Sequence, residues 1–247
     1  MLLYMESIQI YINSKTADKF NNNKIADAQY ILPTIEIPDG FHIYLSLQKA
    51  SIPHTFYNIN MTNNLLDISD NTNNIISYII PVGNYNMNQL VSYLQTTTGI
   101  NIQYNSITNK LTFTNTKIWN IQSSSTILSI LGFNDVTTVQ SSLTFIIESI
   151  HCANLASVKT INIATNVTTM NINKAIPNNN SIIASIPVNS PPYSIIQYEN
   201  ANNCRANLYI NSLSMLNIKL IDDLGYLIDL NGVHYSMTFQ IDIVSFR

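Results

Sequence analysis

Apolar and polar residues alternate along most of this chain. In the stretch SIQIYINS, at residues 7–14, isoleucine occupies every second position and the residues between carry polar groups. The same period of two runs through FHIYLSLQ at 41–48 and SMTFQIDI at 236–243. Strands with one apolar and one polar face are typical of antiparallel sheets that pack face to face and leave their outer faces to solvent. The pattern therefore predicts an all-β protein built as a β-sandwich.

Turn residues fall where these strands need to end. The Pro-Asp-Gly sequence at 38–40 precedes the second of the three strands, and Gly225 suits the left-handed position of a hairpin turn. The pair Asn231-Gly232 predicts a two-residue turn into the last strand. Between Leu213 and Leu216 the apolar alternation slips, which predicts a β-bulge or a bend in that strand.

One clear helix interrupts the strands, within the sequence IIPVGNYNMNQLVSYLQ. Asn86 is a suitable N-cap and Gln89 occupies the third helical position, as in a capping box. Leu90, Val91 and Leu94 form an apolar stripe at helical spacing. Because a hairpin cannot cover its own apolar face, we expect this stripe to lie across the hairpin that follows it in the chain.

That hairpin is predicted at residues 100–114, where two alternating segments flank a polar loop. A second, shorter helix is predicted around residues 125–131, in SSSTILSILGF. Gly132 can end it in the left-handed conformation, and Phe133 can fold back onto its last turn. The helices and the hairpin therefore form an elaboration on the sandwich.

The predicted domain organisation is a single domain of residues 1–247 with this helix and hairpin insertion at about residues 84–140. Two polar segments, at 13–28 and 166–181, are expected to be loops or mobile segments. The first residues, MLLYMESIQI, lack the charged and apolar regions of a signal peptide. No stretch approaches the roughly 20 apolar residues of a membrane helix. We therefore expect a soluble protein without a membrane span, made in a cytosol-like compartment.

Composition narrows the function further. Hydrophobic residues make up 46% of the chain, which is enough for a core, but charged residues make up only 10%, where about 25% is usual. The formal net charge of −3 argues against nucleic acid as the main partner, because phosphate binding needs a basic patch. Cys152 and Cys204 are too few for a disulfide framework and are expected to be reduced.

Candidate catalytic chemistry is sparse. The histidines His42, His54, His151 and His234 show no metal-ligand spacing, and the adjacent Asp222-Asp223 suits a turn better than an acid–base pair. No G-x-S-x-G motif is present, and PVGN lacks the second glycine and the lysine of a P-loop. The sequence therefore predicts a protein that is not an enzyme, with no catalytic residue, metal or cofactor.

Three stretches in a fixed order resemble a known family. They are QKASIPHTFYNINMTNN, then IPVGNYNMNQLVSYL, then the pair NKLTF and ILGF, and the tail from residue 207 to 243 adds to the likeness. Together they resemble the minor capsid, or penton, proteins of virophages and Polinton-like viruses. The resemblance covers residues 41–135 and 207–243.

This resemblance implies a jelly-roll subunit that forms pentamers and closes the fivefold vertices of an icosahedral virion. The implied partners are other copies of the chain and a major capsid protein, and the implied place of synthesis is the host cytoplasm or a viral factory. The residues that match the family motifs are expected to define the fold, as are the helix leucines Leu90 and Leu94. The matching residues are Ile52, Pro53, Tyr57, Asn58, Gly83, Asn84, Tyr85, Gly132 and Phe133.

The shortage of charge fits such a subunit, because interface cores are depleted in charge and a member of a closed ring uses two different patches. Two alternatives remain open. Nucleotide bias could have produced the same composition in a monomer. The 14 tyrosines could instead line a carbohydrate groove in a viral fibre or a lectin-like sandwich that binds glycans or a host receptor.

Overall fold

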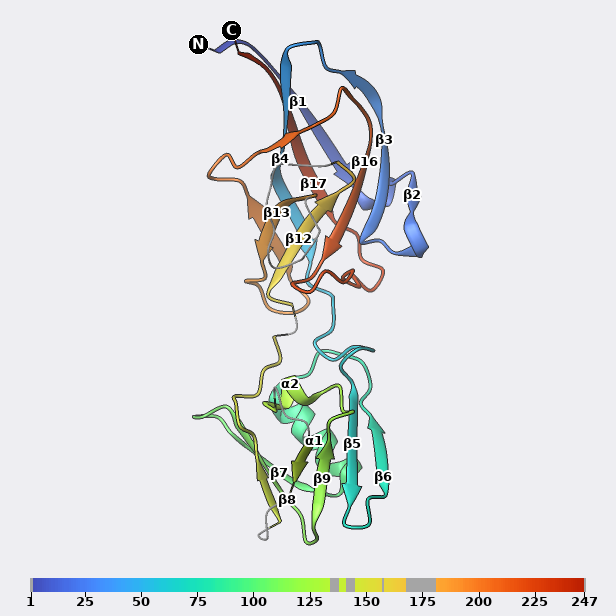
Figure 1. The fold of residues 1–247 in the computed structure, drawn as a ribbon, viewed down its shortest axis with the longest axis vertical. Coiled ribbons are helices and arrows are strands. Elements are labelled where there is room, and N and C mark those ends of the chain that lie inside the picture. Colours follow the sequence, from blue (N-terminus) through green and yellow to red (C-terminus); the bar gives the residue numbers. More distant parts are fainter. Residues whose placement is uncertain (1, 134–137, 141–144, 157, 168–180, 247) are drawn as a thin grey trace. The chain divides into compact units, whose positions relative to one another are not determined.

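The computed structural model describes residues 2–133, 138–140, 145–156, 158–167 and 181–246 (Figure 1). The chain forms two compact units. Unit 1 contains Met1–Phe56 and Val158–Arg247, and unit 2 contains Tyr57–Ser157. Unit 2 is thus inserted within the sequence of unit 1. The single domain with an insertion at about residues 84–140 stays a prediction. Unit 2 extends beyond that insertion at both ends.

In its described residues, unit 1 is a sandwich of two antiparallel sheets, each with five strands. The order in the first sheet is β1 (Leu2–Asn13), β17 (Ser236–Phe246), β4 (Phe41–Pro53) and β14 (Ile195–Glu199), and β15 (Ala206–Leu208) also pairs with β4. The order in the second sheet is β13 (Ile182–Pro187), β12 (Thr160–Thr165), β16 (Ser212–Ile221), β3 (Asp27–Glu36) and β2 (Lys19–Phe20). The all-β antiparallel sandwich predicted from the sequence is confirmed.

The apolar alternation is the physical reason for this arrangement. Leu45 on β4 and Ile241 on β17 are paired across the first sheet, and both are fully buried in the core between the sheets. The predicted slip in β16 is a register shift against β3, between Leu213 and Met215. The predicted turn before the last strand has left-handed backbone at both residues, with φ of 49° at Asn231 and 80° at Gly232.

Unit 2 has two smaller antiparallel sheets and two helices in its described residues. The four-stranded sheet has the order β10 (Thr138–Gln140), β9 (Trp119–Gln122), β5 (Leu65–Asp70) and β6 (Ile75–Ile79). The three-stranded sheet has the order β11 (Ile146–Glu148), β8 (Lys110–Thr114) and β7 (Asn101–Asn105). The helices are α1 (Met87–Thr98) and α2 (Leu128–Leu131). The hairpin predicted at residues 100–114 is the pair β7 and β8.

Helix α1 begins and packs as predicted. The Asn86 side chain accepts a hydrogen bond from the backbone of Gln89, whose side chain accepts one from the backbone of Asn86, so the capping box is complete. Leu90, Val91 and Leu94 are the buried residues of the helix, in one core with the apolar residues of β7 and β8. The helix therefore covers the apolar face of the hairpin.

Helix α2 is shorter than the predicted 125–131, but its end is as expected. Gly132 is left-handed with φ of 83°, and its N–H points at the carbonyls of Leu128 and Ser129. Phe133 is fully buried. The structure adds a second requirement for glycine, because a Cβ at residue 132 would lie 2.2 Å from the carbonyl oxygen of His151.

The two polar segments have different outcomes. Residues 13–28 contain two 3-10 helices, η1 (Ser14–Thr16) and η2 (Asn21–Asn23), and the short strand β2, so this segment is ordered by local structure. In the predicted loop at 166–181, residues 168–180 lie outside the described part of the chain. No helix among the described residues is long and apolar enough to cross a membrane.

Candidate interaction surfaces

The first two family motifs meet in space at the start of unit 2. The backbone N–H of Asn58 donates to Oδ1 of Asn84 at 3.0 Å, and the Asn58 side chain donates to the Tyr85 carbonyl at 2.8 Å. The Tyr85 N–H donates back to Oδ1 of Asn58 at 2.9 Å. Gly83 completes the junction through a two-way backbone bridge with Ile59. The bonds join segments that are 27 positions apart in the chain.

The other motif residues are placed separately. Ile52 and Pro53 are buried at the end of β4 in unit 1, whereas Gly132 and Phe133 end α2 in unit 2. Tyr57 is half-buried at the first position of unit 2. The motif residues therefore form buried or hydrogen-bonded structural positions rather than one shared pocket. That they define the fold stays a prediction.

Two of the ionisable residues considered as candidates for chemistry, His54 and Asp222, have structural partners. Nδ1 of His54 lies 2.8 Å from the Ser190 carbonyl, and its ring stacks on Phe56. Oδ1 of Asp222 accepts hydrogen bonds from the backbone of Leu224 and Tyr226, as a turn residue would. In the part of the chain that the structure describes, no three His, Cys, Asp or Glu residues are grouped as a metal site.

Shifted pKa values also have structural causes. Burial raises the pKa of Tyr30 and, much more strongly, that of Tyr235, and the two hydroxyls lie 3.3 Å apart in the core of unit 1. The pKa of Asp70 is lowered chiefly because the Thr72 hydroxyl donates to its carboxylate in a surface turn. Tyr30 lies in the core and Asp70 in a surface turn, whereas the buried Tyr235 is one of the residues that line the hollow described below.

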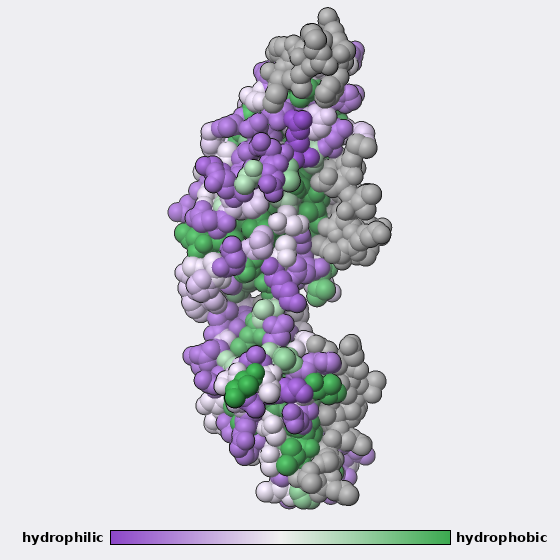
Figure 2. All heavy atoms as spheres, turned by 90° about the vertical axis from the view of Figure 1, so that its left-hand side faces the viewer, coloured by the Kyte–Doolittle hydropathy of each residue, from purple (hydrophilic) through white to green (hydrophobic). Residues whose placement is uncertain are grey.

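The outer face of the first sheet in unit 1 is mainly neutral and polar. Its charged groups are paired: Arg205 lies 3.7 Å from Asp242 and over the ring of Tyr44, and Lys49 lies 3.3 Å from Glu199. Figure 2 shows one side of the molecule, where hydrophilic residues predominate and hydrophobic residues form small separate groups. The outer face of the first sheet therefore offers hydrogen-bonding groups and carries little net charge.

A hollow of about 370 Å³ lies in unit 1 beside Tyr193. Tyr193 has a left-handed backbone with φ of 66° and is 74% exposed, and this conformation is uncommon for a bulky residue. Ile195 and Val233 line the same hollow, together with hydroxyl groups such as that of Ser51. This combination of an exposed ring and neutral hydrogen-bonding groups could hold an uncharged polar ligand.

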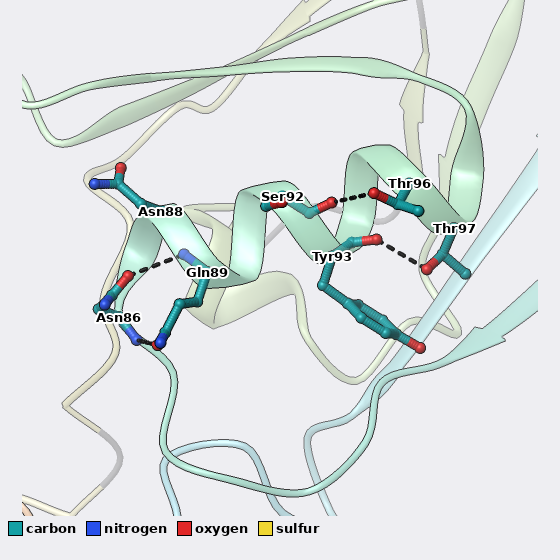
Figure 3. A pocket seen from close by; sticks show the side chains of 7 residues that line it. All are labelled: Asn86, Asn88, Gln89, Ser92, Tyr93, Thr96 and Thr97. Carbon is teal, nitrogen blue, oxygen red and sulfur yellow. Dashed lines mark hydrogen bonds between the residues drawn. The ribbon is translucent and has the colours of Figure 1, made fainter.

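Unit 2 presents a second polar surface on the outer face of α1 (Figure 3). A shallow hollow of about 600 Å³ is lined by uncharged side chains: Asn86, Asn88, Gln89, Ser92, Tyr93, Thr96 and Thr97. The hydroxyls of Thr96 and Thr97 donate back to helix carbonyls. The Tyr93 hydroxyl donates to the carbonyl of Ile79 at 3.3 Å and so connects this face to the end of β6.

Strand β6 is exposed on both of its faces. Three of its five residues are exposed isoleucines: Ile75 is 54% exposed, Ile76 is 49% exposed and Ile79 is 70% exposed. It lies at the edge of the four-stranded sheet and pairs with β5 alone among the described strands. Most of the apolar surface of β6 is therefore not covered within its own unit.

Our sequence-based prediction missed this surface, although a signal for it was present. No residue from 71 to 109 is Asp, Glu, Lys, Arg or His, and this run contains β6, α1 and β7. Six charged residues fall between positions 57 and 157, against 19 in the rest of the chain. The shortage of charge is thus concentrated in unit 2.

Comparison with known proteins gives a fold but no family. No protein-family model and no curated protein matched the sequence. The fold is similar to the crystal structure of the mavirus penton protein, with a TM-score of 0.52 and 10% sequence identity. The likeness covers 96% of this chain and 99% of the mavirus protein. Both units therefore belong to a penton-like, β-rich fold.

Proposed function

We propose that this chain is a structural protein of a viral capsid, a minor capsid protein of the penton type. It assembles with copies of itself, as a pentamer, to close the fivefold vertices of an icosahedral virion. The observation that carries this proposal is the extent of the fold likeness, because it spans nearly the whole of both chains. A common sandwich module alone would match only part of a chain with two units.

The surface chemistry supports self-assembly. Specific interfaces bury on the order of 1,200–2,000 Å², so a ring member with two neighbours hides a large part of its surface. Paired charges on unit 1 and the uncharged face of α1 allow close approach of identical copies without like-charge repulsion. A major capsid protein is the expected neighbour outside the ring. Nucleic acid is not expected as the main partner in this function, and no cofactor is implied by it.

Native mass spectrometry of the purified full chain tests the proposal, with electron microscopy of the same sample. The expected result is a five-membered particle with fivefold averages. A chain that stays monomeric at every concentration tested, or that forms only two-fold dimers, contradicts the pentameric vertex role.

A second candidate function rests on the hollow beside Tyr193. A viral fibre or lectin-like protein would bind a neutral glycan there by stacking a sugar on the exposed ring and bonding its hydroxyls to neighbouring polar groups. A glycan array distinguishes the two functions. Selective glycan binding that is lost in Tyr193→Ala would favour the second candidate, and no binding would leave the first.

A further inference from the structure

We infer that the surface formed by β6 and the outer face of α1 is one of the two patches through which neighbouring copies of this chain bind. This surface, called the α1–β6 surface below, is defined by Ile75, Ile76 and Ile79 with Ser92 and Tyr93. The inference rests on the proposed self-assembly and assigns it a location. It lies wholly within unit 2.

The first argument is the unprotected edge of β6. An edge strand exposes backbone N–H and C=O groups that can pair with another strand, and native proteins commonly block such edges with charges, proline or a bulge. β6 has no charged residue and no proline, and its pairing with β5 runs without a register shift. In the described residues no other strand covers its outer edge. Apart from the Ile79 carbonyl, which accepts from the Tyr93 hydroxyl, the described edge is therefore open to a strand or loop from outside the unit.

The second argument is that apolar and polar groups are combined as in an interface. Ile79 is 70% exposed, and the hydrogen bond from Tyr93 to its carbonyl joins the strand to the helix face. The helix adds neutral hydrogen-bonding groups, including those of Asn88 and Ser92. An apolar centre beside polar, uncharged groups is the usual composition of a specific protein interface.

The third argument selects a second copy as the partner. Identical chains carry identical charges, so contacts between them favour surfaces on which repulsion cannot arise. The run from 71 to 109 has no ionisable acid or base apart from tyrosine. A basic or acidic partner, such as a nucleic acid or an anionic membrane, would find no opposite charge here. Two identical copies, in contrast, can bind each other at this surface without opposite charges.

The test uses the full chain with charges introduced at exposed positions. Ile79→Lys and Ser92→Lys place a charge on the α1–β6 surface, and Ile79→Gln changes the same position without a charge. The matched control is Ile107→Lys, at a position that is 91% exposed on the loop between β7 and β8 in the same unit. Sedimentation velocity and native mass spectrometry measure association, and Trp119 emission checks that unit 2 remains folded.

We expect Ile79→Lys and Ser92→Lys to weaken association by about tenfold or more. Ile79→Gln should weaken it less, and Ile107→Lys should associate like the wild type. Hydrogen exchange gives an independent readout, because assembly should protect the amides of residues 75–79. These amides must exchange more slowly in the wild-type oligomer than in dilute monomer, in which pairing with β5 already protects part of them.

The outcomes separate this inference from the proposed function. If the wild type forms rings and both lysine variants form them equally well, the inference is wrong and the proposed function stands. Equal weakening by Ile107→Lys also overturns it, as do β6 amides that are no better protected in the oligomer than in the monomer. A wild type that never associates overturns the proposed function and the inference together. Binding of an unrelated protein at this surface, without self-association, would have the same consequence.

Discussion

Units 1 and 2 of the chain solve the problem of covering a sheet in different ways. In the described residues of unit 1 two five-stranded sheets cover each other, and the long alternating strands bury most of one face. In the described part of unit 2 the sheets have four and three strands, and helix α1 covers the β7–β8 hairpin. Unit 1 carries 19 of the charged residues and unit 2 only six. The smaller unit therefore has the smaller core and also the more neutral surface.

In unit 2, a small core and an uncharged surface therefore occur together. A small domain buries a smaller fraction of its surface and is less stable for that reason. Unit 2 leaves apolar strand β6 exposed as well, so its stability depends on a few buried contacts around α1. A unit built for contact with other chains can leave such surface uncovered until it assembles.

One residue makes the comparison measurable. Trp119 is the only tryptophan of the chain, and it is buried in the core of unit 2. Its fluorescence therefore reports the unfolding of unit 2 alone, whereas the far-ultraviolet circular dichroism of the strands reports both units. The predictions below use this pair of signals.

Leu94→Asp should have the largest effect. Leu94 is fully buried between α1 and the hairpin, so the substitution places a carboxylate in an apolar core and should cost about 4 kcal/mol or more. The Trp119 transition should be lost or fall sharply in urea. Leu45→Asp is the matched variant in unit 1, where Leu45 is also fully buried. Soluble Leu94→Asp protein with an unchanged Trp119 transition would show that α1 does not stabilise unit 2.

Gly132→Ala should come next, at about 3 kcal/mol. The new Cβ would lie 2.2 Å from the His151 carbonyl oxygen, and the left-handed φ of 83° is strained for alanine. The control is Gly99→Ala, because Gly99 is also left-handed but has nothing within 4 Å of a Cβ. Urea titrations followed by Trp119 should give a much smaller loss for Gly99→Ala. Equal losses would assign the whole effect to backbone conformation.

The same glycine illustrates how far the sequence could predict the structure. The left-handed cap at Gly132 follows from local order of residues, as do the capping box at Asn86 and the turn at Asn231-Gly232. The contact with His151 joins positions 19 residues apart, and no local pattern indicates it. Local propensity therefore predicted the caps, turns and alternating strands, which depend on neighbours in the chain.

Longer-range features were harder to predict for the same reason. The junction of Asn58 with Tyr85 needs both segments in place before its hydrogen bonds exist. No proline, glycine or charged residue lies within two positions of Tyr57, where unit 2 begins. The exposure of β6 was missed because an apolar run such as IISYII predicts burial as readily as an edge. Only the absence of charge from residue 71 to 109 could have indicated a surface of unusual chemistry.

Tyr235→Phe tests unit 1 at high pH. Burial raises the pKa of Tyr235 and Tyr30 above the ordinary value of 10.0, so the folded protein keeps these protons above pH 10 while the unfolded chain loses them. Their stabilisation is therefore complete below pH 10 and is lost as the pH rises from there through the folded pKa. Circular dichroism should show unit 1 losing stability in that range, with a smaller loss in Tyr235→Phe.

At neutral pH the same variant should cost only about 1–2 kcal/mol, because the Tyr30 hydroxyl loses its partner at 3.3 Å. The Trp119 transition serves as the internal control, since neither tyrosine lies in unit 2. An alkaline loss that is identical with and without the Tyr235 hydroxyl would mean that other groups cause it.

Asn86→Ala should have the smallest effect, about 1 kcal/mol, and it should be confined to unit 2. The Asn86 side chain accepts from the backbone of Gln89 at 2.9 Å, so alanine leaves that N–H to solvent and removes half of the capping box. Asn88→Ala is the control, since Asn88 is exposed on the same helix and does not cap it. Urea titration by Trp119 emission measures both variants.

Because α1 covers the hairpin, a loss of helix stability must also destabilise the core around Trp119. A cap effect that lowers the Trp119 midpoint while the unit 1 signal stays constant would establish that each unit depends on its own covering element. A uniform shift of both signals would show instead that the two cores unfold as one.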